Sequence, residues 1–502
     1  MLRLSTVGFL SIVGTFILIS CSSPAGYWPD ASWRSSPPEQ QGIESSRLAA
    51  MFEHVSQAGY DVHSVLIIRH GYLVTEAYAD PYTRDLPHDL FSCTKSVTGT
   101  LLGMTIGDGL VTNVGAHLDD FFADEAKDAG AGEIPLEALL TMSAGFPGIA
   151  VLRSADLAQK DDAVRFVLGL PRSSESNRSF IYSNASPHLV SAAVKKVTGS
   201  DTLFYAQDRL FDPLGIRCNR WPADKSGVQI GGSGLRLTPL DMAKLGYLYL
   251  TNGVWKGKQI VPAEWVKAAT RQHIPTSGMN EAENHGYGYF WWMNDFGGFS
   301  AHGTGGQYIF VVPRLDLVVV FTGMLAETDF PVPYRLMTDF VLPAVVSSRA
   351  ISPDPAGNKR LDAIMSRMEN PDVGALARLP PLASRISGRR FQFREPNPVD
   401  VSSFAIEFGQ EHECNLNLSV TPAPNLNFSV PVGLDNRYRH TRDSMLGDLY
   451  VKGRWLDGDT MEFTLVRPPE RLLMHASFDS EGVTFTIIGT AIRFRAYRAP
   501  AA

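Results

Sequence analysis

The sequence has few cysteines, little net charge and no long apolar run after its first twenty residues. Its four cysteines are spaced too widely to indicate a disulfide framework or a zinc site. The net charge of −7 provides no basic excess for a nucleic-acid partner. No later segment is apolar over the roughly 20 residues that a membrane-spanning helix requires. With 44% hydrophobic residues, we expect a globular protein. We expect it to need neither a metal nor a cofactor.

The first twenty residues have the pattern of an export signal. Arg3 provides a positive start, and the apolar stretch LSTVGFLSIVGTFILIS follows it. The run ends in Leu18-Ile19-Ser20-Cys21, which resembles the lipobox of bacterial lipoproteins. That resemblance implies cleavage before Cys21, a diacylglyceryl group on its thiol, and anchoring to the cell envelope, at the outer membrane or periplasmic face of a Gram-negative cell. The alternative is an ordinary secretory signal, which also predicts export.

Composition divides the rest of the chain into four segments. Residues 21–40 are rich in proline and serine and are predicted to be a tether, and residues 41–345 mix strand-like and helix-like patterns. Residues 346–383 are predicted to be a linker with one short helix, and residues 384–502 a second domain. This organisation predicts an α+β domain followed by an all-β domain.

The two ends of residues 41–345 predict one antiparallel sheet. Near the start, VHSVLIIRHGYLVTEAYA predicts two strands joined by a tight His-Gly turn. Near the end, residues 308–312 and 317–321 flank a turn and predict a second hairpin. Mostly helical segments lie between them. We therefore expect a sheet with strands from opposite ends of the domain and a large helical insert.

The last 119 residues, 384–502, contain eight short alternating segments, from VSSFAIEF to IRFRAYR. Their spacing of roughly 8 to 12 residues predicts a small barrel or a sandwich. No group of residues in this part has a catalytic pattern. We expect this domain to have a structural or substrate-shaping role.

Ser92 and Lys95 form the only S-x-x-K pattern of the sequence, in the stretch FSCTKSVTG that opens an apolar segment. Residues three apart share one face of a helix, so the lysine amine can reach the serine hydroxyl. The N-terminus of a helix disfavours a nearby cation, which helps Lys95 to lose its proton. Because an uncharged lysine can act as the base for a serine, we predict a nucleophile and its base.

Tyr182 and Asn184 form the only Y-x-N pattern, in FIYSNASPHLV. A tyrosine near a lysine is expected to have a lowered pKa, because the cation favours the phenolate. Tyr182 would then relay a proton between Ser92 and the leaving group. Asn184 would hold the amine of Lys95 and offer its amide to the substrate. The alternative for this tripeptide is a plain turn before a helix.

A third pattern lies in HGTGGQYIFVV, where small residues precede a predicted strand, and it comprises His302, Gly303, Thr304 and Gly305. Small residues allow another backbone to approach, and backbone N–H groups there can stabilise an oxyanion. The alternative is a glycine-rich turn before an ordinary hairpin strand. The pattern leaves open whether Thr304, Gly305 or Gly306 would share the oxyanion with the N–H of Ser92.

The three patterns, in this order, resemble the serine β-lactamase and penicillin-binding-protein superfamily. The resemblance is to its class C-like branch of esterases, D-amino-acid peptidases and 6-aminohexanoate-dimer hydrolases, and it covers roughly residues 40–345. It implies a β-lactamase/transpeptidase-like fold, with Ser92 as the acylated nucleophile, Lys95 as general base and Tyr182 in proton transfer. The domain beyond residue 380 resembles the β-domain of some bacterial members.

The third pattern departs from that family. Many relatives have Lys-Thr-Gly on this strand, where the lysine meets the carboxylate of a β-lactam, whereas this chain has His302. A histidine is a poorer anchor for a carboxylate than a permanent cation. The sequence therefore predicts an exported, lipid-anchored serine hydrolase that acts on a small-molecule ester or linear amide.

Two alternatives stay open from the sequence. The first is a true β-lactamase or D,D-carboxypeptidase. The second is a non-catalytic binding or sensor lipoprotein of the cell envelope that kept the fold, although a pure binder does not need the whole set of patterned residues. The sequence does not indicate the oligomeric state.

Several other side chains are expected to have no catalytic role. Trp291 and Trp292 are neighbours on a predicted strand and point to opposite faces, so at most one can line the substrate cleft. No histidine is placed to activate Cys93, which is expected to be a buried helix residue. Three histidines are expected at the surface or at helix ends: His117, His188 and His285.

Overall fold

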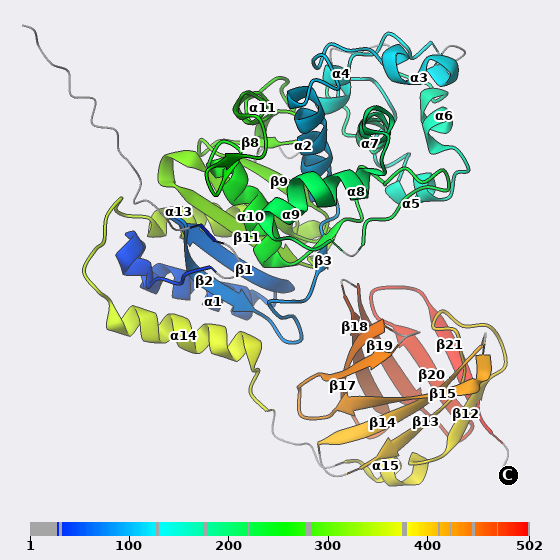
Figure 1. The fold of residues 1–502 in the computed structure, drawn as a ribbon. Coiled ribbons are helices and arrows are strands. Elements are labelled where there is room, and N and C mark those ends of the chain that lie inside the picture. Colours follow the sequence, from blue (N-terminus) through cyan, green and yellow to red (C-terminus); the bar gives the residue numbers. More distant parts are fainter. Residues whose placement is uncertain are drawn as a thin grey trace, which may run out of the picture.

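The computed structural model describes residues 28–29, 33–126, 130–173, 179–218, 220–276, 284–373, 379–409, 412–421, 423–443, 447–468 and 470–499. The predicted signal segment and Cys21 lie outside these residues. The described chain forms an α+β domain followed by a β-barrel, as Figure 1 shows. Among the described residues, none of the helices combines the length and the apolar character that a bilayer crossing demands.

The first domain is built on a seven-stranded antiparallel sheet in the order β2-β1-β11-β10-β9-β8-β7. Its strands are β1 (Val62–Arg69), β2 (Tyr72–Tyr78), β7 (Asn284–Tyr287), β8 (Trp292–Asn294), β9 (Phe299–Gly303), β10 (Gln307–Val312) and β11 (Leu317–Gly323). The hairpins β1–β2 and β10–β11 lie side by side in the sheet, where Val65 of β1 is paired with Phe321 of β11. Both predicted hairpins and the α+β fold are therefore confirmed.

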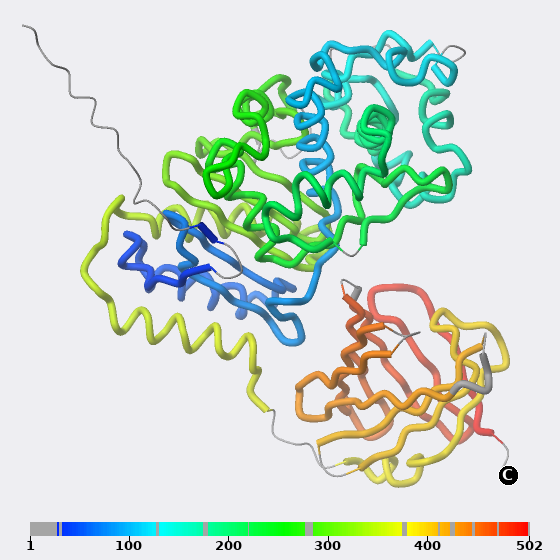
Figure 2. Tube along the Cα trace, in the orientation of Figure 1, coloured from blue at the N-terminus to red at the C-terminus, as the bar shows by residue number. Residues whose placement is uncertain are grey.

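Helices cover both faces of this sheet. Along β11, Val318 and Val320 pack against the helical insert, whereas Val319 and Phe321 pack on the opposite face. That opposite face is covered by α1 (Ser45–Ala58) and α14 (Pro355–Glu369), which Figure 2 shows side by side in blue and yellow. Because β11 is buried on both sides, it is apolar at nearly every position rather than alternating.

Parts of the predicted tether and linker pack into this domain. Trp33 is buried, with its ring centroid 5.7 Å from that of Tyr247. In α14, Leu361 and Ile364 enter the core beneath the sheet. Isolated apolar residues in a proline- and serine-rich or strongly polar stretch produce no clear periodic pattern, so their packing is not visible from the sequence.

The helical insert lies between β2 and β7 and is followed by further helices after β11. Its helices are α2 (Cys93–Gly107), α3 (Asp119–Ala126), α4 (Leu136–Leu140), α5 (Ser154–Ala158), α6 (Ala163–Leu168), α7 (Ala185–Thr198), α8 (Thr202–Ala206), α9 (Asp212–Leu214), α10 (Pro239–Leu250) and α11 (Ala263–Ala269). Short strand pairs join β3 (His88–Asp89) to β4 (Arg236–Leu237) and β5 (Val254–Trp255) to β6 (Lys258–Gln259). After the sheet come α12 (Val332–Leu336), α13 (Leu342–Ala344) and, past α14, α15 (Pro381–Ile386).

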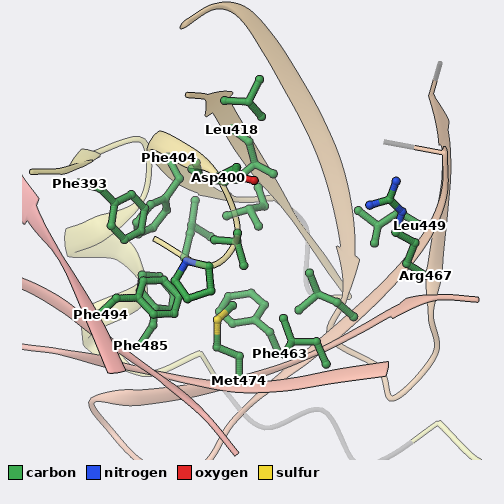
Figure 3. Close-up of a pocket in the computed structure, with 18 of the residues that line it drawn as sticks. Phe393, Asp400, Phe404, Leu418, Leu449, Phe463, Arg467, Met474, Phe485 and Phe494 are labelled. Carbon is green, nitrogen blue, oxygen red and sulfur yellow. The ribbon is translucent and has the colours of Figure 1, made fainter. Parts of the chain in front are cut away.

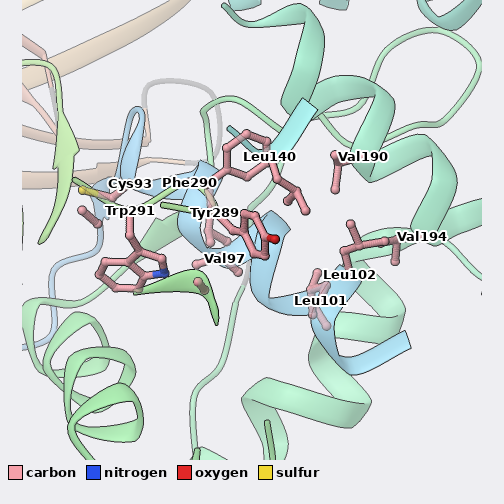
Figure 4. Close-up of a cluster of buried hydrophobic side chains, with 14 of the residues drawn as sticks. Cys93, Val97, Leu101, Leu102, Leu140, Val190, Val194, Tyr289, Phe290 and Trp291 are labelled. Carbon is pink, nitrogen blue, oxygen red and sulfur yellow. The ribbon is translucent and has the colours of Figure 1, made fainter. Parts of the chain in front are cut away.

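The helix α2 runs through the centre of the insert. Every residue from Cys93 to Thr105 is buried, and Figure 4 shows Val97, Leu101 and Leu102 among side chains of neighbouring elements. Gly103 permits this packing, since a Cβ there would lie 2.2 Å from the ring of Trp265. A helix that is buried on all sides excludes charged side chains, which explains why no charged residue lies between Lys95 and Asp108.

The C-terminal domain is a closed β-barrel, which decides between the predicted barrel and sandwich. Its strands are β12 (Arg390–Phe393), β13 (Val401–Phe408), β14 (Glu413–Val420), β15 (Ala423–Gly433), β16 (Arg439–Asp443), β17 (Gly447–Trp455), β18 (Thr460–Arg467), β19 (Glu470–Phe478), β20 (Gly482–Ile487) and β21 (Arg493–Arg498). The ring closes where Gly433 of β15 pairs with Lys452 of β17, which leaves β16 outside it. The eight predicted segments omit β12 and β16, which are short strands of four and five residues.

The barrel contacts the first domain at the loop that follows β2. Tyr82 and Leu86 of this loop form a buried cluster with Val466 of β18. Beside it, Arg471 Nη1 lies 3.0 Å from Asp61 Oδ2. The barrel therefore packs against the segment that leads to β3 and Ser92.

Candidate active site

Ser92 lies at the start of α2, directly after a strained turn. Phe91 has a φ of 44°, in the left-handed region that side chains other than glycine rarely adopt. Its N–H donates to Asp89 Oδ1 at 2.7 Å, and the N–H of Leu90 donates to the carbonyl of Leu235 at 2.8 Å. Such strain persists where surrounding contacts fix it, and here it fixes Ser92 at the N-terminus of a buried helix.

Lys95 reaches back to Ser92 within one helical turn, as the spacing predicts. Its Nζ lies 2.9 Å from Ser92 Oγ, 2.9 Å from Asn184 Oδ1 and 3.0 Å from the carbonyl oxygen of Gly232. The side chain is buried, and burial lowers the pKa of the Lys95 amine to about 7. A substantial fraction of Lys95 is therefore uncharged at neutral pH.

The three partners of Lys95 determine where its lone pair points. An uncharged amine has two N–H groups and one lone pair. The oxygens of Asn184 and Gly232 can only accept, so they take the two N–H groups. The lone pair is then directed to Ser92, whose O–H donates to it. This arrangement can remove the proton from the serine hydroxyl.

The side chain of Asn184 is held in one orientation by a hydrogen bond to the carbonyl of Leu152. Asn184 lies at the N-cap position of α7, and its Nδ2 donates to the carbonyl of Leu152 at 3.0 Å. With the amide nitrogen engaged there, the oxygen faces Lys95. The structure thus brings Asn184 to the amine of Lys95, as the sequence predicts.

Gly232 is the site residue that the sequence analysis missed. The glycine pair at 231–232 packs tightly against α7, since a Cβ on Gly231 would lie 1.9 Å from the carbonyl oxygen of Pro187. Thr98 Oγ1 of α2 donates to the carbonyl of Gly231 at 2.9 Å, which ties the pair to the helix of the nucleophile. The signal in the sequence was GGSG, whose glycines allow a close approach of backbones.

Tyr182 lies against both residues of the S-x-x-K pattern. Its phenol lies close enough to the Ser92 hydroxyl for that hydroxyl to influence its pKa, and the Nζ of Lys95 lies 4.8 Å from the centroid of its ring. Burial nevertheless raises the pKa of the phenol, and the Ser92 hydroxyl offsets only part of this. The predicted lowering of the Tyr182 pKa is therefore wrong, because burial penalises the phenolate. The phenol stays neutral and can both donate and accept a hydrogen bond.

Trp292 forms an aromatic wall beside Tyr182. Its ring centroid lies 5.4 Å from that of Tyr182 and 5.2 Å from that of His302. Trp291 points to the other side, where its centroid lies 4.5 Å from that of Tyr249, and Figure 4 shows it beside α2. Of the two tryptophans, only Trp292 contacts the site residues, as expected for neighbours on a strand.

The third pattern, residues 302–305, lies next to Ser92. It forms the end of strand β9 and the turn that follows, rather than the start of a strand. The strand β9 ends at Gly303, and β10 begins at Gln307. A Cβ on Gly303 would lie 2.3 Å from the carbonyl oxygen of Leu90, which shows how closely this strand approaches the nucleophile segment. In the turn, Thr304 is exposed, and Gly305 has a φ of 79° that favours glycine.

His302 is part of the aromatic wall. Its Nε2 lies 2.7 Å from Ser300 Oγ, and burial lowers the pKa of His302 to about 3. The imidazole is therefore neutral at ordinary pH and provides no cation for a substrate carboxylate.

One cysteine and three histidines were expected to have no catalytic role, and they differ in burial. Cys93 is buried, and burial raises the pKa of its thiol, so it is no nucleophile. His117 and His285 are exposed, but His188 is buried with its Nε2 3.2 Å from Asp224 Oδ2. His188 lies in the first turn of α7, which agrees with the helix-end part of the prediction, but it is buried rather than at the surface. Across the described ranges, no group of histidines, cysteines and acids could hold a metal ion.

Comparison with known proteins agrees with this geometry. The family model described as Beta-lactamase matches residues 48–340. The 6-aminohexanoate-dimer hydrolase of Paenarthrobacter ureafaciens is 24% identical over 287 residues, which are 53% of this chain and 73% of that protein. A putative D-alanyl-D-alanine carboxypeptidase of Escherichia coli O157:H7 is 26% identical over 231 residues, which are 40% of this chain and 53% of that protein. The chain thus spans about half the length of the second relative.

Solved structures share the fold. A putative β-lactamase from Bacteroides dorei DSM 17855 is 17% identical, with a TM-score of 0.52 over 60% of this chain and 99% of that one. SurE, solved with D-Leu, is 15% identical, with a TM-score of 0.50 over 91% of this chain and 99% of that one. Because the family model covers more than half of the chain and the similar proteins are hydrolases of this fold, the chain belongs to the Beta-lactamase family, as a serine hydrolase of the β-lactamase and penicillin-binding-protein superfamily.

Proposed function

We propose that the protein hydrolyses an ester or a linear amide through an acyl-enzyme on Ser92. The observation that carries this proposal is the position of the Lys95 amine, which is buried, partly uncharged and 2.9 Å from Ser92 Oγ. Lys95 takes the proton of the hydroxyl as Oγ attacks the substrate carbonyl. The proton then passes to the leaving group, directly or through the phenol of Tyr182, and the carbon–leaving-group bond breaks.

The second half of the reaction reverses these roles with water. A water molecule loses a proton to Lys95, directly or through the neutral phenol of Tyr182, which passes its own proton on, and attacks the acyl carbon. The bond to Ser92 Oγ breaks as the serine regains a proton from Lys95. The oxyanion of each tetrahedral intermediate is stabilised by the N–H of Ser92 and by one N–H of the adjacent turn, residues 304–306. Asn184 keeps the amine oriented throughout.

Two features favour a neutral ester or linear amide as the substrate. His302 is uncharged and stacked on Trp292, so the third pattern provides no permanent cation. The rings of Trp292 and Tyr182 provide an apolar wall instead. The name of the Paenarthrobacter relative, a 6-aminohexanoate-dimer hydrolase, supports a linear amide.

The second candidate is a D,D-carboxypeptidase or β-lactamase, which the name of the Escherichia coli relative favours. Purified protein assayed with p-nitrophenyl esters, linear amides, D-amino-acid peptides and nitrocefin separates the two. Turnover of esters or linear amides with negligible nitrocefin and D-peptide turnover supports the first proposal. The reverse order of kcat/KM overturns it.

The nucleophile is tested with a fluorophosphonate probe. We expect wild-type protein and the Cys93→Ala variant to be labelled, and Ser92→Ala to be neither labelled nor active. Cys93→Ala is the matched control because it removes the adjacent nucleophilic atom and leaves the hydroxyl in place. Labelling of Ser92→Ala would place the nucleophile elsewhere.

We further propose that the protein is exported and lipid-anchored through Cys21. The support is the lipobox-like sequence that precedes this cysteine. Labelled palmitate fed to expressing cells should enter the wild-type protein and a Cys218→Ser control, but not Cys21→Ser. Equal labelling of the Cys21→Ser variant would exclude this anchor.

A further inference from the structure

The β-barrel encloses a cavity of about 530 Å³, which Figure 3 shows. All of its lining side chains are apolar except Asp400, Arg467 and Arg471. The volume lies within the range of small-molecule binding sites. Barrels of about this strand number have an interior wide enough either to be filled by side chains or to hold one small ligand.

The barrel is packed at one end and hollow at the other. Along β14, Cys414 is fully buried, whereas Leu416 and Leu418, on the same face, are only partly buried and line the cavity. Along β18, Met461 is fully buried, whereas Leu465 is partly buried and lines the cavity. Inward-facing leucines that remain accessible leave apolar surface uncovered, which a ligand would bury.

The hollow end is the end that faces the first domain. Arg467 and Arg471 belong to the hairpin of β18 and β19, and both line the cavity. Arg471 is paired with Asp61 of the first domain at 3.0 Å, so its charge is balanced. Arg467 is exposed and forms no ion pair with any residue that the structure describes. Among the side chains that the structure describes, Arg467 thus has no carboxylate paired with it at the rim of the apolar cavity.

Two further arginines, both close enough to Asp89 to interact with its carboxylate, share a hollow with Arg467. Arg467 lines this second hollow, of about 510 Å³ between the domains, together with Arg220 and Arg236. The acidic side chain of that hollow, Asp448, is already bonded to Arg442 at 2.8 Å. In Figure 3, Arg467 lies beside Leu449, away from a group of four phenylalanines: Phe393, Phe404, Phe485 and Phe494.

From this arrangement we infer that the barrel binds a single-chain aliphatic carboxylate, with its tail in the cavity and its carboxylate at Arg467. The tail is apolar because the walls offer apolar contact and few polar partners. The volume admits on the order of 15 methylene-sized groups, taking about 30 Å³ for each. An arginine binds a carboxylate through paired N–H donors. This site does not depend on the chemistry at Ser92.

Calorimetric titration of the full chain with saturated carboxylates of 8, 10, 12 and 14 carbons, each below its micelle concentration, tests the inference. We expect one molecule bound per chain and an affinity that rises about four-fold per methylene until the cavity is filled. An alkylammonium of equal length should bind at least ten-fold more weakly. Absence of binding at every chain length, or equal binding of the ammonium, overturns the inference.

Substitutions test where the ligand binds. Leu416→Trp, which fills the cavity, should abolish binding, whereas Leu456→Trp, an exposed site on the same domain, should not. Arg467→Gln should remove the preference for carboxylate over ammonium and leave chain-length dependence intact. Binding that survives Leu416→Trp in a folded protein overturns the assignment.

A measurement on unaltered protein covers the case in which Leu416→Trp does not fold. With ¹³C-methyl methionine, the signal of Met474, which lines the cavity, should shift on saturation with the 12-carbon carboxylate. Met474→Leu identifies that signal by its loss. A Met474 signal that stays in place at saturation shows that the ligand binds elsewhere and overturns the inference.

Discussion

The side-chain oxygen of Asn184 lies 2.9 Å from the Nζ of Lys95, although the two residues are 89 positions apart in the sequence. Together with the carbonyl of Gly232, it takes the two hydrogens of the uncharged amine. The remaining lone pair is directed to Ser92. The proposed chemistry depends on this arrangement, so each residue in it can be tested separately.

Activity of the wild-type protein should fall as the pH drops below about 7. Lys95 must be unprotonated to accept the serine proton, and burial sets the pKa of its amine at about 7. At pH 5, kcat/KM for a p-nitrophenyl ester should be about 100-fold below its plateau. Lys95→Arg, which stays charged, should lose about 10²–10⁴-fold in kcat at every pH. A profile that is flat between pH 5 and 8 would contradict Lys95 as the base.

Asn184→Asp should move the rising limb of the pH profile to higher pH. A carboxylate beside the Lys95 amine favours its charged form and raises the pKa of that amine, so kcat/KM at pH 7 falls about ten-fold or more and recovers in alkali. Asn252→Asp adds the same charge at an exposed position far from the amine and should leave the profile unchanged. If both variants keep the pH dependence of kcat/KM of the wild-type protein, the side-chain oxygen of residue 184 does not control the pKa of Lys95.

Tyr182→Phe should lower kcat without moving the acidic limb. The substitution removes the hydroxyl beside Ser92 but keeps the ring against Trp292 and leaves Lys95 as the base. We expect a loss of about 10²-fold, which is typical of one proton-transfer group. Tyr205→Phe removes a hydroxyl bonded to Asp108, away from the site, and serves as the control. A normal rate for Tyr182→Phe would exclude the phenol from proton transfer.

Gly231→Ala should reduce both stability and activity. The added Cβ would meet the carbonyl of Pro187, so the backbone that offers the Gly232 oxygen must move. Overpacking of this kind costs about 1–3 kcal/mol of unfolding free energy, which denaturant titration can measure. Gly458→Ala, where the Cβ meets no neighbour, is the matched control. Unchanged kcat in a Gly231→Ala variant would show that the Gly232 carbonyl is not needed.

Elements with a strong local pattern were predictable, and elements that depend on distant partners were not. The β10–β11 hairpin follows from two apolar runs around a turn, and the register Val312 to Leu317 agrees with it. The strands β12 and β16 fall outside the eight predicted segments because they are short, with four and five residues. The linker was predicted to hold one short helix, whereas α14 has 15 residues and packs into the core through residues such as Leu361 and Ile364.

The sequence by itself determined that Ser92 and Lys95 share one helical face, because a spacing of three residues fixes that relation through local geometry. It also indicated Tyr182 and Asn184 by their pattern, and the family by the order of the three patterns. Only the tertiary structure decided the charge states, since burial lowers the pKa of Lys95 and raises that of Tyr182. It likewise supplied Gly232, which lies 137 positions from Lys95. Desolvation and long-range contacts arise from the packing of the whole chain, so no local spacing contains them.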